Sequence, residues 1–284
     1  MPELPEVTTI TNQLKKELVE KVFSNVFVNL NYKTYPSNEG FIKDVAGSKV
    51  LDVYRIAKVI IIKIAKDEKE SYITIHLAMT GGLRYFSSEK KHLGGDSVLV
   101  KFEFEDDSIL TFTDQRRFGY VKLLDEREFL TLTQKYASDP FEINLKSFEK
   151  NIKSKRTNIK NALLNQSLIS GIGNIYANDA LFMAKIHPET KTVILTIAQL
   201  NSLLTALKTI LKEGINHKGS TLSDLMYTDI YGGYGEHQKY FRVYGKNGSP
   251  CAICTTNIEF KILNGRGTYY CLKCQPFLKP VLTL

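Results

Sequence analysis

The first six residues bring an unusual nucleophile and two carboxyl groups together. Pro2 is small enough that we expect removal of the initiator methionine, which exposes a secondary amine with a pKa of roughly 8. Such an amine is partly neutral near pH 7 and can attack a sugar C1′ to form an iminium. Glu3 and Glu6 are three positions apart, so both can face one side of a helix start, where one could protonate the sugar or the leaving base. Alternatively, the acids only complement a helix dipole, which these residues alone favour.

Four cysteines near the C-terminus have the spacing of a metal site. Cys251 and Cys254 form one C-x-x-C pair, Cys271 and Cys274 form a second, and sixteen residues separate the pairs. Each pair can present two thiolates to one tetrahedral Zn²⁺, and the stretch between them can form a hairpin that turns near Gly265. We therefore predict one structural zinc ion. Because no export signal is seen, disulfides are the less favoured alternative.

Other positions carry residue types suited to phosphate binding. Arg266 lies between two glycines at the expected hairpin turn and is predicted to bind a phosphate. Gly171–Asn174 follows Lys155 and Lys160 and lies between two helical stretches, where a tight turn and a helix N-terminus favour an anion, although an ordinary helix connection explains the glycines equally well. Lys58 interrupts an apolar pattern between two strands. It could neutralise a phosphate or protonate a leaving group, and a strand lysine with its ammonium group in solvent is the alternative.

Composition and charge indicate a soluble globular protein with a polyanionic partner. The 284 residues suffice for two domains, and the net charge is +8. From Phe141 onward there are 18 Lys and Arg against 9 Asp and Glu, which leaves 20 against 21 before it. The second half is therefore expected to hold most of the polyanion contact. The longest aliphatic run, around Val59–Ile62, is too short to cross a bilayer, and with no export signal seen we expect a cytosolic protein.

The hydrophobic periodicity predicts a helix, then many strands, then helices. Val7, Ile10, Leu14 and Leu18 recur at helical spacing within 4–20. Short strands without intervening helices indicate a sandwich or barrel; they are predicted at Val22–Leu30, Lys49–Tyr54, Val59–Ile64, Tyr72–His76, Ser97–Phe104, Ile109–Thr113 and Tyr120–Leu123. A linker is expected at Ala137–Pro140, and it is followed by helices at Asn158–Asn165, Ile175–Met183 and Ile197–Glu213.

Taken together, these residues resemble the formamidopyrimidine-DNA glycosylase/endonuclease VIII family over essentially the whole chain. Six motifs followed by the cysteine pairs occur in the family's order: Pro2–Val7, Arg55–Lys58, His76–Gly81, Asp114–Gly119, Asn158–Lys160 and Gly171–Tyr176. The chain departs from the family pattern at Ala78, where a glycine is common, at Thr8, where an acid is usual, and at Gly81-Gly82, where the usual loop is stiffer.

The resemblance implies an α+β protein with a β-sandwich, flanking helices, a helix-two-turn-helix domain and a zinc-ribbon finger. We expect a catalytic domain over 1–137, a linker over 138–145, a helix-two-turn-helix domain with a lesion-capping loop over 146–236, and the zinc finger over 237–284.

The same resemblance implies the roles of the site residues. Pro2 is expected to be the Schiff-base nucleophile and Glu3 the general acid, with Glu6 supporting the site, Lys58 donating a proton in β-elimination and Arg266 assisting δ-elimination. The expected DNA contacts are His92, Arg116, Lys155, Lys160, Asn174 and Arg266. Met79, Arg116 and Phe118 are expected to fill the gap left when a damaged base is flipped out, and Lys218, Gly219, Ser220 and Thr221 to form the capping loop.

The implied activity is that of a bifunctional DNA glycosylase and AP lyase of base excision repair. The resemblance also implies a protein of the bacterial cytosol, associated with the nucleoid through DNA. Its expected substrates are 8-oxoguanine and formamidopyrimidines in double-stranded DNA and abasic sites, processed by a monomer through β,δ-elimination. Arg116 and Phe118 favour this branch over an endonuclease VIII-like enzyme for oxidised pyrimidines. A non-enzymatic zinc-containing DNA-binding protein is the third reading, and it leaves Pro2, Glu3 and Lys58 without a role.

Overall fold

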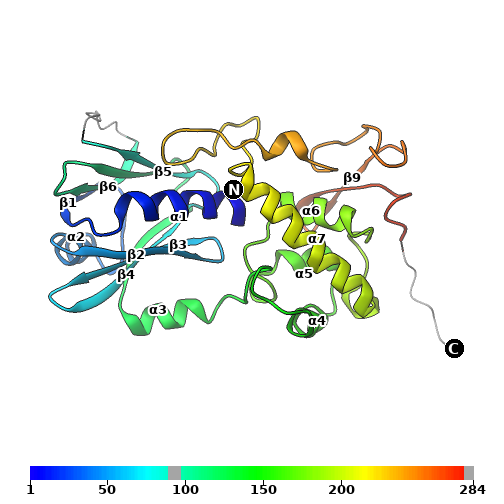
Figure 1. The fold of residues 1–284 in the computed structure, drawn as a ribbon, viewed down its shortest axis with the longest axis horizontal. Helices are drawn as coiled ribbons and strands as arrows, with labels where there is room; N and C mark the ends of the chain where they lie inside the picture. Colours follow the sequence, from blue (N-terminus) through cyan, green and yellow to red (C-terminus); the bar gives the residue numbers. More distant parts are fainter. Residues whose placement is uncertain (89–96, 278–284) are drawn as a thin grey trace. The chain divides into compact units, whose positions relative to one another are not determined.

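The chain divides into two compact units, each made of two separate segments. Unit 1 comprises Met1–Gln134 and Ile215–Gln238, and unit 2 comprises Lys135–Gly214 and Lys239–Leu284. The structure is a computed structural model that describes residues 1–88 and 97–277 (Figure 1).

Unit 1 contains two four-stranded antiparallel sheets. The first has the strand order β1-β6-β7-β5 and the second the order β2-β3-β4-β8. The strands are β1 (Phe23–Val28), β2 (Lys49–Ile56), β3 (Val59–Lys66), β4 (Lys69–His76), β5 (Gly81–Phe86), β6 (Val98–Phe104), β7 (Ile109–Asp114) and β8 (Tyr120–Leu124). Apolar side chains of both sheets belong to one buried cluster, including Ile62 and Ile73 from one sheet and Phe102 and Phe112 from the other. The predicted sandwich is therefore confirmed.

Helix α1 (Leu4–Leu18) closes this core. The predicted stripe of Val7, Ile10, Leu14 and Leu18 is fully buried in the same cluster, and Pro5 lies in the first turn, where its missing N–H has no consequence. The helix packs against β2. Two short helices, α2 (Asn38–Val45) and α3 (Glu126–Thr133), complete the unit.

The segment Ile215–Gln238 comes from beyond the helical part of the sequence but packs in unit 1, and we call it the strap. Ile230 is fully buried in the core of the sandwich, and its carbonyl accepts a hydrogen bond from the Tyr85 N–H at 2.9 Å. The Gln13 amide on α1 donates to the Asp229 carboxylate at 2.9 Å. The expected domain 146–236 thus differs from the compact units, because the strap is anchored by core and backbone contacts to the sandwich.

Unit 2 is helical and ends in a hairpin. Its elements are α4 (Leu145–Lys153), α5 (Ile159–Leu164), α6 (Asn174–Met183), the 3₁₀ turn η1 (Thr192–Ile194), α7 (Ile197–Asn216), whose last two residues begin the strap, and the strands β9 (Glu259–Leu263) and β10 (Arg266–Tyr270). A second 3₁₀ turn, η2 (His237–Tyr240), spans the end of the strap. The predicted helices near 158, 175 and 197 and the predicted hairpin are confirmed.

Besides the two 3₁₀ turns, four helices and strands of the described residues were not expected from the sequence. Three are the helices α2, α3 and α4, which have eight or nine residues and begin at the capping side chains of Ser37, Asp125 and Asn144, so they are too short to show clear periodicity. The fourth is β5, which begins at Gly81-Gly82, where a soft loop was expected. A Cβ on Gly81 would lie 2.3 Å from the Leu77 carbonyl oxygen, so only glycine permits this close approach.

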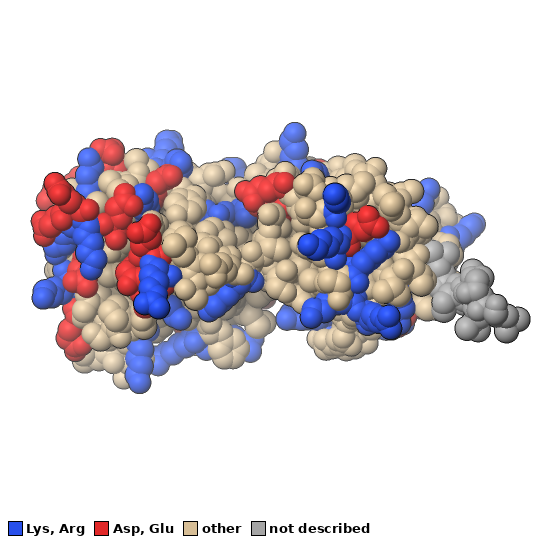
Figure 2. Space-filling model, turned by 90° about the horizontal axis from the view of Figure 1, so that it is seen from below, with Lys and Arg blue, Asp and Glu red and all other residues tan. Residues whose placement is uncertain are grey.

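The charge asymmetry follows the two units more closely than the two halves of the sequence. Unit 1 has 20 Lys and Arg against 23 Asp and Glu, and unit 2 has 18 against 7. On the face drawn in Figure 2, acidic side chains gather mainly over unit 1, and the charged side chains over unit 2 are mostly basic. No helix in the described part of the chain is both long and apolar enough to cross a membrane.

Candidate active site and DNA-contacting loops

The start of α1 holds the two predicted acids in a reciprocal arrangement. Glu3 is the N-cap residue, and its side chain accepts a hydrogen bond from the Glu6 N–H. The Glu6 Oε2 accepts one from the Glu3 N–H at 2.8 Å, which completes a capping box. Both carboxyl groups are buried, and Pro2 immediately precedes them. Both acids therefore stabilise the start of the helix, and the same hydrogen bonds hold them next to Pro2.

Glu6 also joins α1 to the strap. Its second oxygen, Oε1, accepts a hydrogen bond from the Ser220 N–H at 2.7 Å. Gly219 has a φ of +82°, and a Cβ there would lie 2.7 Å from the Glu6 Cγ, so a side chain cannot fit. The predicted capping loop, 218–221, thus contacts one of the predicted catalytic acids directly. Ser220 and Thr221 are buried, and the Thr221 hydroxyl donates to the Tyr227 carbonyl.

Lys58 occupies the turn between β2 and β3 and is buried, unlike a strand lysine that extends into solvent. The preceding Ala57 has a φ of +54°, a left-handed conformation that is uncommon for alanine. Arg55 supports this turn, because its NH1 donates to the Ala57 carbonyl at 3.2 Å and its Nε donates to the Thr8 hydroxyl at 2.7 Å. The hydroxyl of Thr8 thus accepts a hydrogen bond at a position where the family usually has an acid.

His76 ends β4 close to Lys58. Burial lowers the pKa of His76, and the positive charge of Lys58 lowers it further. The His76 Nδ1 accepts a hydrogen bond from the Ala78 N–H at 3.2 Å, which requires an unprotonated Nδ1. Ala78 has a φ of +49°, which explains why a glycine is common at this position of the family.

The three predicted gap-filling side chains lie together on unit 1. The Arg116 NH1 lies 3.3 Å from the Met79 Sδ, and the Arg116 guanidinium lies 4.6 Å from the centroid of the Phe118 ring. Met79 and Phe118 are exposed by 44% and 60%, which is unusual for large apolar side chains. The cluster presents an apolar surface and a cation to solvent.

Lys160 is the clearest departure from the expected DNA contacts. Its side chain is 0% exposed, and its Nζ donates to the Gly267 carbonyl and to the Thr268 hydroxyl, both at 2.7 Å. A buried ammonium that donates to the hairpin has no exposed surface with which to reach a phosphate. The expected direct contact of Lys160 with DNA is therefore corrected. Lys160 instead supports the hairpin that carries Arg266.

Arg266 and Lys155 are both exposed and line one surface hollow of unit 2, together with Asn161, Asn165 and Asn264. Asn174 lies at the first turn of α6, and its side-chain amide donates to the Gly267 carbonyl at 3.1 Å, so it also supports the hairpin. Two cations beside amide side chains suit a phosphate group.

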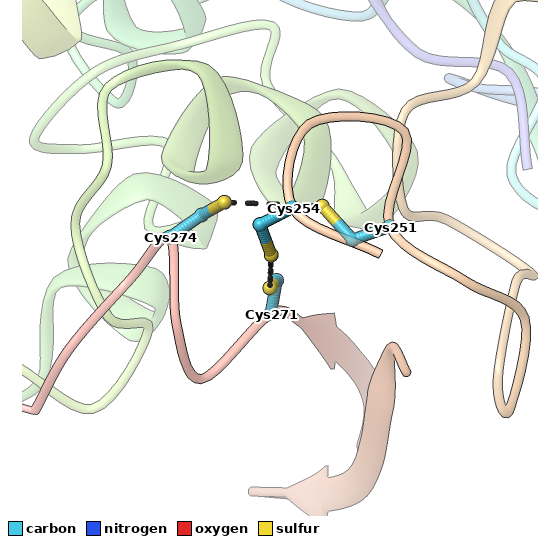
Figure 3. Close-up of side chains that lie close together, drawn as sticks. All are labelled: Cys251, Cys254, Cys271 and Cys274. Atoms are coloured by element: carbon cyan, nitrogen blue, oxygen red, sulfur yellow. Dashed lines mark hydrogen bonds between the residues drawn. The ribbon is translucent and has the colours of Figure 1, made fainter. Parts of the chain in front are cut away.

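The four cysteines converge at the base of the hairpin (Figure 3). Their sulfur atoms all lie within 4.8 Å of one another, with Cys251 Sγ 3.8 Å from Cys274 Sγ and Cys254 Sγ 3.4 Å from Cys271 Sγ. A tetrahedron with Zn–S bonds of about 2.3 Å separates its sulfurs by about 3.8 Å. The cluster therefore has the donor set and the size of a metal site.

The remaining residues are one expected DNA contact, His92, and two residues that were not predicted. His92 lies outside the described residues. Sequence reasoning did not single out Asp114 and Thr80, which connect the loops that carry the gap-filling side chains. The sequence signal that could have identified Asp114 is its position, because it is an acid directly after an apolar predicted strand and directly before a basic loop.

Known proteins match this chain over its whole length. Two family models match: the formamidopyrimidine-DNA glycosylase N-terminal domain over residues 1–121 and the formamidopyrimidine-DNA glycosylase H2TH domain over residues 136–225. The formamidopyrimidine-DNA glycosylase of Mycoplasma genitalium is 38% identical, with 100% of this chain and 99% of the relative covered. That of Herpetosiphon aurantiacus is 36% identical, with 97% and 100% covered.

Solved structures agree. The Lactococcus lactis Fpg in complex with abasic site containing DNA has a TM-score of 0.86 at 29% identity and covers 97% of this chain and 100% of its own. A variant of the same protein in complex with a Fapy-dG containing DNA has a TM-score of 0.86 at 28% identity, with 97% and 100% covered.

With these matches, the two-sheet unit, the basic helical unit and the cysteine cluster define a DNA-binding protein of the glycosylase class. The chain belongs to the formamidopyrimidine-DNA glycosylase family. The family and the fold class predicted from the sequence are therefore confirmed.

Proposed function

We propose that the amine of Pro2 is the nucleophile with which this protein excises oxidised purines from double-stranded DNA. The protein is a DNA glycosylase and AP lyase of base excision repair. The observation that carries the proposal is the arrangement at the start of α1, where Glu3 and Glu6 are buried and mutually bonded next to Pro2. The third reading, a non-enzymatic DNA-binding protein, does not explain a buried acid pair beside a terminal amine.

The proposed chemistry has two stages. The neutral Pro2 nitrogen attacks C1′ of the damaged nucleotide, the bond from C1′ to the base breaks, and the base leaves with a proton. Glu3 protonates the sugar ring oxygen as the ring opens, which leaves an iminium between Pro2 and C1′. Loss of a proton from C2′ then expels the 3′ phosphate, with Lys58 as the proposed proton donor to the leaving group. Arg266 assists δ-elimination of the 5′ phosphate.

The remaining site residues are proposed to bind DNA. Met79, Arg116 and Phe118 fill the gap in the duplex, which offsets the few kcal/mol of unstacking and lost pairing that extrusion costs. Lys155 and Arg266 hold phosphates at the hollow of unit 2, and the strap residues 218–221 cover the extruded base. The Lactococcus lactis relative binds a Fapy-dG containing DNA, which supports ring-opened purines as substrates here.

Zinc is the metal that we propose for the cysteine cluster. Four thiolates at these separations suit a closed tetrahedral site, which binds the metal structurally and leaves no position for a substrate. Reduced cysteines in a metal site also fit a protein of the bacterial cytosol.

Borohydride trapping on a duplex with 8-oxoguanine opposite cytosine tests the nucleophile. Wild-type protein should form a covalent adduct that N-terminal mass analysis places at Pro2. A Pro2→Glu variant should form none, because a large residue at position 2 retains Met1 and displaces the amine. Pro5→Ala is the matched control and should trap normally, since Pro5 lies within α1.

The outcomes separate the alternatives. Normal trapping by Pro2→Glu would exclude Pro2 as the nucleophile. Faster adduct formation with a thymine-glycol duplex would move the substrate to oxidised pyrimidines. No adduct from wild-type protein that still binds DNA and has lost Met1 would contradict the catalytic proposal.

A further inference from the structure

Asp114 lies where two connections between the sheets of unit 1 meet. The segment 77–80 runs from β4 in one sheet to β5 in the other and carries Met79. The segment 115–119 runs from β7 back to β8 and carries Arg116 and Phe118. Asp114 is the last residue of β7, and its side chain is buried although it is charged.

The Asp114 carboxylate accepts hydrogen bonds from both connections. Oδ1 accepts the Thr80 hydroxyl, at short range, and the Arg116 N–H at 3.2 Å. Oδ2 accepts the Gly119 N–H at 2.7 Å. One carboxylate thus joins the segment with Met79 to both ends of the segment with Arg116 and Phe118.

Thr80 completes the connection between the two segments. Its Oγ1 donates to Asp114 and also accepts the Arg116 N–H at 3.0 Å. Gly119 fixes the other end, because a Cβ there would lie 2.5 Å from the His76 carbonyl oxygen, so the backbone approaches β4 too closely for any side chain. The two segments are therefore bonded to each other and not merely adjacent.

We propose that Asp114 and Thr80 are positioning residues that hold Met79, Arg116 and Phe118 in one preformed cluster for base extrusion. The inference rests on the gap-filling role given under Proposed function. The side chains of Met79, Arg116 and Phe118 are all exposed. Packing alone therefore does not fix them. The hydrogen bonds of Asp114 and Thr80, which we call the bracket, do fix them and reduce the ordering that DNA binding would otherwise require.

The chemistry of the bracket makes two substitutions informative. Asp114→Asn keeps the shape but offers one acceptor oxygen, and its NH₂ group then faces an N–H donor. Thr80→Val keeps the branched shape and removes the hydroxyl, which breaks the bond between the two segments. Thr113→Val is the matched control, because Thr113 is the neighbouring residue on β7 and its hydroxyl has no hydrogen bond to either segment among the described residues.

Amide hydrogen exchange tests the bracket without DNA. Asp114→Asn should speed exchange at Arg116 and Gly119, and Thr80→Val should speed exchange at Arg116, while Thr113→Val should leave both rates unchanged. Unchanged exchange at these amides in both bracket variants, with wild-type melting temperatures, overturns the inference.

Extrusion is measured by the fluorescence of 2-aminopurine placed beside an 8-oxoguanine. Each bracket variant should extrude about tenfold more slowly, the loss expected for one hydrogen bond to a charged group. Cleavage of a preformed abasic site in single-stranded DNA should not change, because that substrate has no gap to fill. Equal losses on both substrates would indicate a general structural defect and overturn the positioning role.

Met79→Ala separates failure of this inference from failure of the proposed function. Normal extrusion by Met79→Ala overturns the gap-filling role, and with it the bracket's function. Slow extrusion by Met79→Ala with normal extrusion by Thr80→Val overturns the bracket alone. Slow extrusion by both, with Thr113→Val normal, supports it.

Discussion

The gap-filling cluster of unit 1 and the hairpin of unit 2 both present exposed side chains, but different interactions hold them. The cluster stands on a sandwich with a large buried core, and a single carboxylate fixes its loops. Among the described residues, the hairpin packs against a small buried cluster that includes Val243, Ile258 and two of the cysteines. Its position depends on the cysteine site at one end and on Lys160 at the other.

This difference shows how core size decides the means of support. A sandwich can hold two loops with buried hydrogen bonds, because its strands are already fixed. A two-stranded hairpin is marginal by itself, so it needs further support, which a metal at the cysteines and hydrogen bonds from Lys160 on a neighbouring helix can supply. We therefore expect the hairpin to fail first and on its own when its supports are removed.

Removal of the proposed zinc ion should have the largest effect. Cys271→Ser, or a chelator, should unfold the hairpin region, because metal binding and folding are coupled in such sites and contribute about 10 kcal/mol in zinc-finger peptides. DNA affinity should fall about a hundredfold or more, as expected when several phosphate contacts are lost. Proteolysis within residues 246–277 with an intact unit 1 is the measurement.

Ile253→Ser, at an exposed position between two ligands, is the control and should retain both metal and hairpin. If unit 1 melts together with the hairpin after chelation, the two regions are not independently supported and the comparison fails.

Gly219→Ala should have the next largest effect, and it tests the strap's contact with Glu6. The new Cβ would meet Glu6 atoms at 2.7 to 3.1 Å in a left-handed conformation, so we expect a loss of roughly 2–4 kcal/mol of unfolding free energy. Gly248→Ala is the matched control, since Gly248 also has a positive φ but nothing within 4 Å, and it should lose about 1 kcal/mol. Equal losses from thermal melts would mean that contact with Glu6 adds nothing.

Helix α1 and the strap show which parts of the fold the sequence could and could not predict. The stripe of Val7, Ile10 and Leu14 predicts α1, because helical spacing is a local property. The place of Ile230 in the core of unit 1 depends on contacts with residues near Tyr85, far away in sequence, and no local pattern reports them. The domain bounds expected from the resemblance therefore left the strap with the helical domain.

For the site residues too, local spacing is visible in the sequence, and contacts between distant residues are not. The cysteine pairs are recognisable as a metal site from their spacing alone, whereas the acids of α1 receive catalytic roles only from the family resemblance. Lys160 is expected to contact DNA from the family resemblance, and no local pattern shows that it is buried, because its acceptors on Gly267 and Thr268 lie more than a hundred residues away. The role of Asp114 is hidden for the same reason, because its partner Thr80 lies on another strand connection.

Lys160→Met should have a moderate effect and sharpens the contrast in how the hairpin is held. We expect DNA affinity to fall about tenfold, as for a lost charge-assisted hydrogen bond, because the hairpin shifts and Arg266 moves with it. In an Arg266→Ala background the same change should then have little further effect, which a double-mutant cycle of dissociation constants measures. Additive losses would mean that Lys160 contacts DNA independently of Arg266. Lys155→Met, on the same hollow, is the control for an independent phosphate contact.

Acidification should have the smallest effect and should act on unit 1 through His76. The folded-state pKa of His76 is lowered by burial first and by Lys58 second. As pH falls below about 6.5, the unfolded chain binds a proton before the folded protein does, so stability is present above that pH and declines toward the folded pKa. Protonation of Nδ1 also removes the acceptor for the Ala78 N–H and should loosen the turn before Met79. An NMR titration of His76 should show the lowered pKa, and Lys58→Met should raise it. A pKa of His76 that Lys58→Met leaves unchanged would contradict the proximity of these two groups.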